Sequence, residues 1–238
     1  MRPIRDESQL EMSIHDRRVH PLPSLHDLPE NQIRQVLFDS SYRRFCIVRN
    51  PYARLVSAWV DKIRQVEPAF ELICCEILRH ARNAERHAVP TFREFVSWVV
   101  ETNDPNSCDI HWRPQQNLLY PDLINYGFVL KFEDLYNDLQ RFFDSDSSTR
   151  GLNAKQLISS NRYNGSLPAN LSGLYDPSLV EQVSKFWASD FSVFDYDATS
   201  WLEFRAKVGP NYTELESSAL SAIRARNAVI RQMGLTRG

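Results

Sequence analysis

The hydrophobic period of the chain changes near position 50. Residues 43–48, RRFCIV, form a short apolar run after two arginines, which is typical of a strand buried on both faces. After Asn50, apolar side chains recur at helical spacing, at Tyr52, Leu55, Val56, Trp59, Val60 and Ile63. Asn50 suits the N-cap and Pro51 the first helical position. The pattern therefore predicts a strand that leads directly into a helix.

The same criteria predict further helices and a second strand. The strand comprises residues 128–132, within YGFVLKF. Helical periodicity predicts helices at 29–38, 68–81 and 91–101, from about 134, from 177, and at 213–233. Strands that alternate with helices indicate an α/β fold, with a parallel sheet flanked by helices. For 238 residues we expect one domain, 1–238.

Capping residues and one apolar stripe add detail to this prediction. Thr91 and Glu94 have the spacing of a capping box, while Asp176 and Pro177 suit an N-cap and a first helical position. The apolar stripe of helix 213–233 suits packing on its own core or on a partner chain. We expect the former, and the sequence leaves the oligomeric state open.

The charge of the chain is nearly balanced, with 28 basic and 30 acidic residues. Neither a nucleic acid nor an anionic membrane is therefore expected as a partner, and any anion site must be local. No segment reaches the roughly 20 apolar residues that span a bilayer, and residues 1–18 lack an apolar signal-peptide core. We expect a soluble, cytoplasmic chain.

The four cysteines do not have the spacing of a metal site, and no metal is expected. Cys46 lies in the first predicted strand, where it suits a small apolar position. Cys74 and Cys75 lie in the apolar stretch FELICCEIL. The pattern predicts that both thiols are buried and inert.

The corner between the first strand and its helix is the strongest candidate for a binding site. Arg49 ends the strand, and Ser57 lies on the polar side of the helix. Ligands of parallel sheets bind beyond the carboxyl ends of strands, where a helix N-terminus offers free N–H groups. A guanidinium and a hydroxyl can hold one anionic group there. Ordinary solvated side chains remain the alternative interpretation.

The run RNPYARLVSAW, residues 49–59, resembles the 3′-phosphate-binding motif of sulfotransferases that use 3′-phosphoadenosine 5′-phosphosulfate (PAPS), particularly carbohydrate sulfotransferases. In that motif an Arg and a Ser eight residues apart hold the 3′-phosphate, which implies this role for Arg49 and Ser57. Residues 111–139 resemble the family's His-Trp, Pro, Tyr and Lys-Phe-Glu segment, and FWASDFSVFDY resembles its C-terminal acidic-aromatic element. The resemblance covers about 36–197 and implies a P-loop NTPase-like fold.

The resemblance implies transfer of a sulfuryl group from the co-substrate PAPS to a hydroxyl of a carbohydrate or other acceptor, without a metal. Such a reaction needs a base, and His111 in the family-like loop is the first candidate, followed by His20 and His26. Glu133 matches an acidic family position, although a carboxylate after a strand also suits a helix cap. Lys131 suits either an anion contact or neutralisation of Glu133. Trp112 suits core packing, or stacking on a sugar.

The sequence departs from the family in two places. The family's 5′-phosphosulfate loop follows an early strand and carries a Lys, but here the first Lys is Lys62 and the first Gly is Gly127. We therefore expect either a chain incomplete at its N-terminus or a relative that lacks half of the cofactor site. Leu119 and Asp122 replace cysteines that form a disulfide in Golgi members, which favours a non-Golgi relative.

Two alternative functions remain open. A non-catalytic relative without the 5′-phosphosulfate loop would bind a nucleotide or a glycan, or act as an interaction partner. A P-loop kinase is disfavoured, because it needs the same phosphate loop and a metal-binding Ser or Thr after its Lys.

Overall fold

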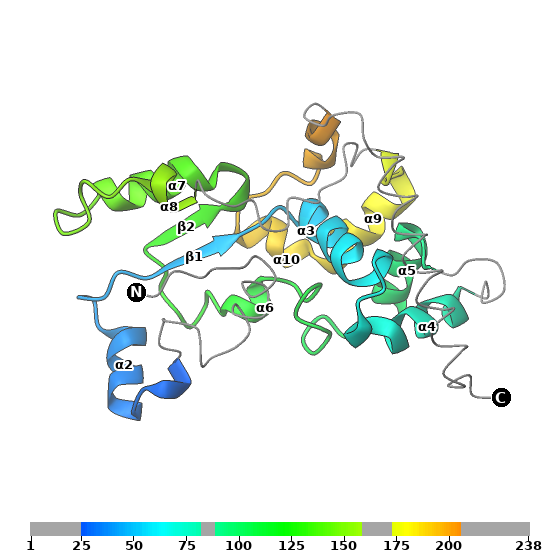
Figure 1. The fold of residues 1–238 in the computed structure, drawn as a ribbon, viewed down its shortest axis with the longest axis horizontal. Helices are drawn as coiled ribbons and strands as arrows, with labels where there is room; N and C mark the ends of the chain where they lie inside the picture. Colours follow the sequence, from blue (N-terminus) through cyan, green and yellow to red (C-terminus); the bar gives the residue numbers. More distant parts are fainter. Residues whose placement is uncertain (1–24, 82–88, 159–172, 206–238) are drawn as a thin grey trace, which may run out of the picture.

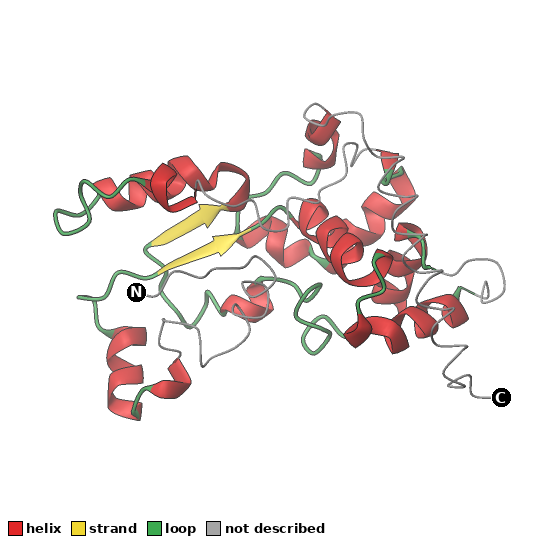
Figure 2. Ribbon diagram, in the orientation of Figure 1, coloured by secondary structure: helices red, strands yellow, loops and turns green. Residues whose placement is uncertain are grey.

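The protein is represented by a computed structural model, in which residues 25–81, 89–158 and 173–205 are described (Figure 1). Two strands, β1 (Phe45–Val48) and β2 (Phe128–Lys131), form a parallel pair in which Phe45 lies opposite Phe128. Helices lie beside this pair and beyond its carboxyl ends (Figure 2). The predicted α/β class with a parallel sheet is therefore confirmed.

The predicted helices that lie within the described residues are present, together with short helical segments that were not predicted. They are η1 (Leu25–Asp27), α2 (Glu30–Phe38), α3 (Pro51–Ala58), η2 (Trp59–Arg64), η3 (Pro68–Phe70), α4 (Glu71–His80), α5 (Phe92–Thr102), α6 (Gln116–Leu119), η4 (Phe132–Asp134), α7 (Leu135–Asp144), α8 (Ala154–Ile158), α9 (Pro177–Phe186), α10 (Ala188–Val193) and η6 (Ser200–Arg205). Segment η2 continues α3 as a π-helix. The helix predicted at 213–233 lies outside the described residues. Among the described helices, none is long and apolar enough to cross a membrane.

The predicted helix caps are present. The Asn50 side chain accepts a hydrogen bond from the Tyr52 N–H at 3.0 Å, and Pro51 opens α3. Thr91 forms the full capping box of α5, and the Asp176 carboxylate accepts from Leu179 N–H at the start of α9. These caps satisfy N–H groups that have no partner within the helix.

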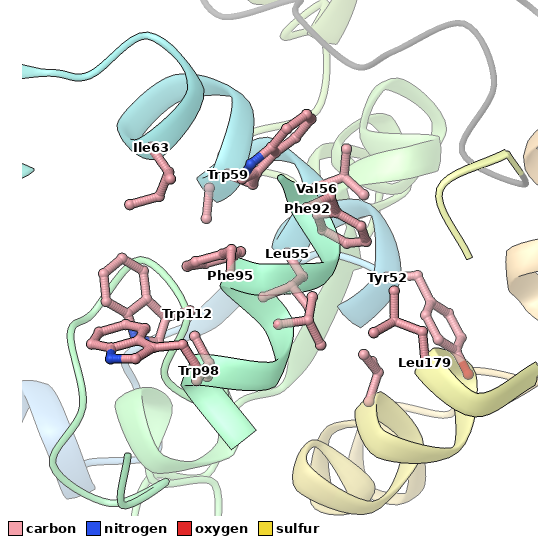
Figure 3. Packing of buried hydrophobic residues seen from close by; sticks show 14 of the residues in the cluster. Tyr52, Leu55, Val56, Trp59, Ile63, Phe92, Phe95, Trp98, Trp112 and Leu179 are labelled. Atoms are coloured by element: carbon pink, nitrogen blue, oxygen red, sulfur yellow. The ribbon is translucent and has the colours of Figure 1, made fainter. Parts of the chain in front are cut away.

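The main hydrophobic core lies among helices beyond the carboxyl ends of the strands. In Figure 1, β1 points toward α3, with α4, α5 and α9 gathered around it. Tyr52, Leu55 and Val56 of α3 are at most 2% exposed and face α5 and α9 (Figure 3). Trp112 is 1% exposed and lies in the same core, which leaves no face of its ring for a sugar. Burial of these apolar side chains stabilises the helices in their positions around the strand end.

The prediction that β1 is buried on both faces is wrong. Cys46 and Val48 are buried against Phe194, whereas Phe45 and Ile47 are 42% and 46% exposed. The described part of the sheet is two strands wide. The α7–α8 cluster on the Phe45 and Ile47 face packs mainly on β2, so Ile47 stays partly uncovered. The apolar run therefore predicted the strand correctly, but it did not show how many faces of that strand are covered.

The prediction that both thiols of the Cys74-Cys75 pair are buried is also wrong. Cys74 is 4% exposed and its thiol donates to the Ile63 carbonyl at 3.6 Å, whereas Cys75 is exposed. Consecutive residues of α4 point about 100° apart, so both cannot face the same core. The apolar flanks of the pair did not distinguish the two positions.

Alkylation should separate these cysteines. Burial raises the pKa of the Cys46 and Cys74 thiols to about 11, and it also raises the pKa of Cys108. Because the thiolate is the reactive species, iodoacetamide at pH 8 should modify Cys75 and spare the other three. Peptide mapping by mass spectrometry measures this, and unfolded protein, in which all four should react, is the control. Equal labelling of Cys74 and Cys75 in folded protein would contradict the described packing.

Candidate functional site

The corner between β1 and α3 is held by hydrogen bonds from distant segments. Asn50 is 2% exposed, and its backbone N–H donates to Glu133 Oε1 at 2.7 Å. Its side-chain amide donates to Ser200 Oγ, also at 2.7 Å. Together with the cap on Tyr52, these bonds satisfy the polar groups of Asn50. These bonds therefore fix the backbone next to Arg49, and with it the position from which the Arg49 side chain extends.

The backbone of Arg49 is held by a side chain. Gln115 Oε1 accepts from the Arg49 N–H, and Gln115 Nε2 donates to the Arg49 carbonyl, both at 2.8 Å. Gln115 is positioned by Asp190, which is 0% exposed and accepts from the N–H groups of Gln115 and Gln116 at 2.8 and 2.9 Å. Burial raises the pKa of Asp190 above its ordinary value, and these hydrogen bonds and the attraction of Arg54 offset only part of that rise. Asp190, Gln115 and Arg49 thus form a continuous chain of contacts.

The Arg49 guanidinium lies over the ring of Phe132, with 4.8 Å from Cζ to the ring centroid. Its Nε is buried and has no hydrogen-bond partner. Burial lowers the pKa of Arg49, and attraction to Glu133 and then to Asp61 opposes that shift. A buried donor without an acceptor costs about 1–3 kcal/mol. An anionic ligand at this position would remove that cost.

Ser57 lies on the next turns of the same helix and joins this cluster through Asp61. Its side chain is 8% exposed, and Oγ donates to Asp61 Oδ2 at 3.2 Å. Asp61 also attracts Arg49, so one carboxylate links the two residues predicted to bind phosphate. We call Arg49, Ser57, Asp61, Phe132 and Glu133 the Arg49 corner.

The polar side of α3 is covered rather than solvated. Arg54 donates to the carbonyls of Arg113 at 2.6 Å and Ile110 at 2.7 Å. Burial lowers the pKa of Arg54 to about 10, against the attraction of Asp190. The loop that contains Ile110 and Arg113 is thereby fastened to α3, which accounts for the low exposure of the polar side.

Glu133 lies in η4, directly after β2, and holds the start of α3. Besides the Asn50 N–H, it accepts from the Tyr196 hydroxyl through Oε2 at 2.9 Å. Burial raises the pKa of Tyr196, and the neighbouring Glu133 raises it further. Lys131 Nζ donates to the Asp195 carbonyl at 2.6 Å and lies over the Tyr196 ring, rather than pairing with Glu133. Both Glu133 oxygens thus support the corner beside Arg49.

His111 lies in a different place. Its Nδ1 is 2.7 Å from Asp109 Oδ1, its ring packs edge-on against Phe70, and its side chain is 34% exposed. A carboxylate at Nδ1 favours the proton there and leaves Nε2 as the basic nitrogen. None of the described contacts joins His111 to Arg49 or Ser57. His20 lies outside the described residues, and His26 falls within η1.

The comparison with known families shows to which family the chain belongs. The profile of the Sulfotransferase family matches residues 2–197, which is more than half of the chain. The chain belongs to the sulfotransferase family. The match ends at the predicted boundary and extends the resemblance, first placed at about 36–197, to residue 2. Within the described residues, no group of three His, Cys, Asp or Glu side chains could hold a metal ion.

Several carbohydrate sulfotransferases are similar to this chain. Carbohydrate sulfotransferase 8 of Homo sapiens is 29% identical over 168 residues, 66% of this chain and 40% of the relative. Carbohydrate sulfotransferase 10 of Danio rerio is 28% identical over 208 residues, 79% of this chain and 56% of the relative. Carbohydrate sulfotransferase 14 of Danio rerio is 36% identical over 120 residues, 48% of this chain and 32% of the relative. The chain thus spans about half or less of each relative's length. No solved structure matches it significantly.

Sequence reasoning missed three residues that contact or support this candidate site. Asp61, Gln115 and Asp190 were not among the candidates, although Gln115 and Asp190 lie in segments with family resemblance. Gln115 and Asp190 are 75 positions apart, and Gln115 and Arg49 are 66 apart. Asp61 stands four residues after Ser57, a helical spacing that was available as a signal.

Proposed function

We propose that this chain is a sulfotransferase that uses PAPS to sulfate a hydroxyl of a carbohydrate, and that the Arg49 corner binds the 3′-phosphate of the donor. The observation that carries the proposal is the buried Nε of Arg49, which has no hydrogen-bond partner. Asp61, which accepts a hydrogen bond from Ser57, also attracts the Arg49 guanidinium. Guanidinium and hydroxyl donors at a strand end suit a phosphate. The carbohydrate acceptor is inferred from the names of the relatives.

The reaction itself assigns further roles. The acceptor oxygen forms a bond to sulfur, while the bond between sulfur and the 5′-phosphate oxygen breaks and adenosine 3′,5′-bisphosphate leaves. The hydroxyl proton passes to a base, for which His111 Nε2, oriented by Asp109, is the candidate. Because the 3′-phosphate lies across the ribose from the sulfuryl group, this base does not need to contact Arg49. The corner then acts by holding and orienting the donor.

Calorimetric titration tests the phosphate site. The 238-residue chain should bind adenosine 3′,5′-bisphosphate more tightly than adenosine 5′-monophosphate, which lacks the 3′-phosphate. Arg49→Ala should weaken the former about 10- to 100-fold, the loss of a charge-assisted bond of about 1.5–3 kcal/mol. Ser57→Ala should weaken it about fivefold, the loss of about 1 kcal/mol.

Arg34→Ala is the matched control, because Arg34 is exposed and pairs only with Glu30 on α2 among the described residues. It should leave both affinities unchanged. Equal affinity for the two nucleotides would refute the proposed site. Binding without sulfuryl transfer to any carbohydrate, assayed with radiolabelled PAPS, would instead favour the non-catalytic alternative.

A further inference from the structure

One carboxylate acts on both residues of the proposed phosphate site. Asp61 Oδ2 accepts the Ser57 hydroxyl at 3.2 Å, and the Asp61 charge attracts the Arg49 guanidinium. Carboxylate and phosphate oxygens are acceptors of the same kind for hydroxyl and guanidinium donors. In the nucleotide-free protein, Asp61 therefore makes interactions of the type that the phosphate would make.

The phosphate and Asp61 compete for the same groups. The Ser57 hydroxyl has one hydrogen, so it cannot donate fully to a phosphate and to Asp61 at once. Charge adds to this competition, because Glu133 and Asp61 already attract Arg49 before any ligand arrives. One of these, Glu133, is held by Asn50 and Tyr196. Asp61 differs from Glu133 because its hydrogen bond uses the Ser57 hydroxyl, a donor that the phosphate would also need.

We propose that Asp61 is an internal substitute for the 3′-phosphate, which the bound nucleotide displaces. This inference rests on the proposed function and adds to it a residue that limits nucleotide affinity. The 3′-phosphate is unchanged by sulfuryl transfer, so donor and product occupy the same Arg49 corner. A carboxylate that returns to Ser57 lowers the affinity for both and speeds release of the product.

Asp61→Asn tests the inference, because asparagine keeps the size of the side chain and removes its charge. Its affinity for adenosine 3′,5′-bisphosphate should be about tenfold tighter than that of the wild type, from loss of charge repulsion. The affinity for adenosine 5′-monophosphate should stay within about twofold. Dissociation of the bisphosphate, followed by stopped-flow displacement, should slow by about the same tenfold factor.

Asp144→Asn is the matched control. Asp144 is exposed at the end of α7, where it accepts from Gln140, and its replacement removes the same charge outside the Arg49 corner. It should leave both affinities unchanged. Asp61→Ala provides a second variant in case Asp61→Asn does not fold, and thermal unfolding checks both.

The outcomes separate the inference from the function on which it rests. If Asp61 only orients Ser57, Asp61→Ala should weaken bisphosphate binding. Unchanged or weaker binding in both Asp61 variants, with the wild type still selective for the 3′-phosphate, overturns the inference alone. No 3′-phosphate selectivity in any variant overturns the inference and the proposed phosphate site together.

Discussion

Asp190→Ala should lower the free energy of unfolding by about 3–5 kcal/mol. The carboxylate is fully buried and accepts from the N–H groups of Gln115 and Gln116. Its removal leaves these donors without partners and takes a counter-charge from the buried Arg54. Loss of one partner from a buried charged network typically costs this much. Urea denaturation at pH 7, followed by circular dichroism, measures the change.

Asp190→Asn is the informative comparison for this effect. Asparagine keeps the shape and one acceptor oxygen, so it should recover part of the lost stability. Asparagine also places an NH₂ group toward the N–H donors of Gln115 and Gln116. The Asp190→Asn variant should therefore remain less stable than the wild type. If alanine and asparagine destabilise equally and by less than about 1 kcal/mol, Asp190 does not support the loop that carries Gln115.

Trp112→Ala should lower the free energy of unfolding by about 3–5 kcal/mol, the usual cost of removing a large buried aromatic ring. The Trp112 ring packs edge-on against Phe95 at 5.4 Å between centroids, and against Trp98 and Phe70 at 6.0 Å. Its carbonyl accepts from the Trp187 indole N–H at 2.9 Å. Alanine keeps that carbonyl but removes the Trp112 indole N–H, which donates to Asn103 Oδ1 at 3.4 Å. The cavity therefore accounts for most of the loss, and this long hydrogen bond for the rest.

Denaturation of two further variants tests this interpretation. Trp112→Phe should lose less stability, because it fills part of the cavity. Phe38→Ala removes an aromatic ring that is 66% exposed, and it should change stability by less than about 0.5 kcal/mol. A similar loss from Phe38→Ala and Trp112→Ala would contradict the described core.

The parts of the fold that local sequence determines could be predicted. A helix cap joins residues two or three positions apart, so Asn50 and the Thr91–Glu94 box were visible in the sequence. The same holds for the parallel pairing of β1 and β2, which follows from the alternation of strands and helices. The exposure of Ile47 could not be predicted, because it depends on the width of the sheet and on which helix covers it.

The candidate site was likewise predictable only in part. The resemblance of RNPYARLVSAW led to Arg49 and Ser57. In the structure, Asp61 accepts a hydrogen bond from Ser57 and its charge attracts Arg49. The support of Arg49 by Gln115 could not be predicted, since nothing local specifies a partner 66 positions away. The Asp109 contact of His111 spans two positions and was within reach of sequence reasoning.

The hydrogen bonds of the β1–α3 corner have a consequence for folding kinetics. Asn50 is tied to Glu133, 83 positions away, and to Ser200, 150 positions away. Contacts of such separation close large loops and form slowly, after local helices and turns. The proposed nucleotide site should therefore form late in folding, once the chain near Ser200 has joined the strands. A nucleotide bound there would stabilise the whole assembly of segments, since it binds only the folded chain.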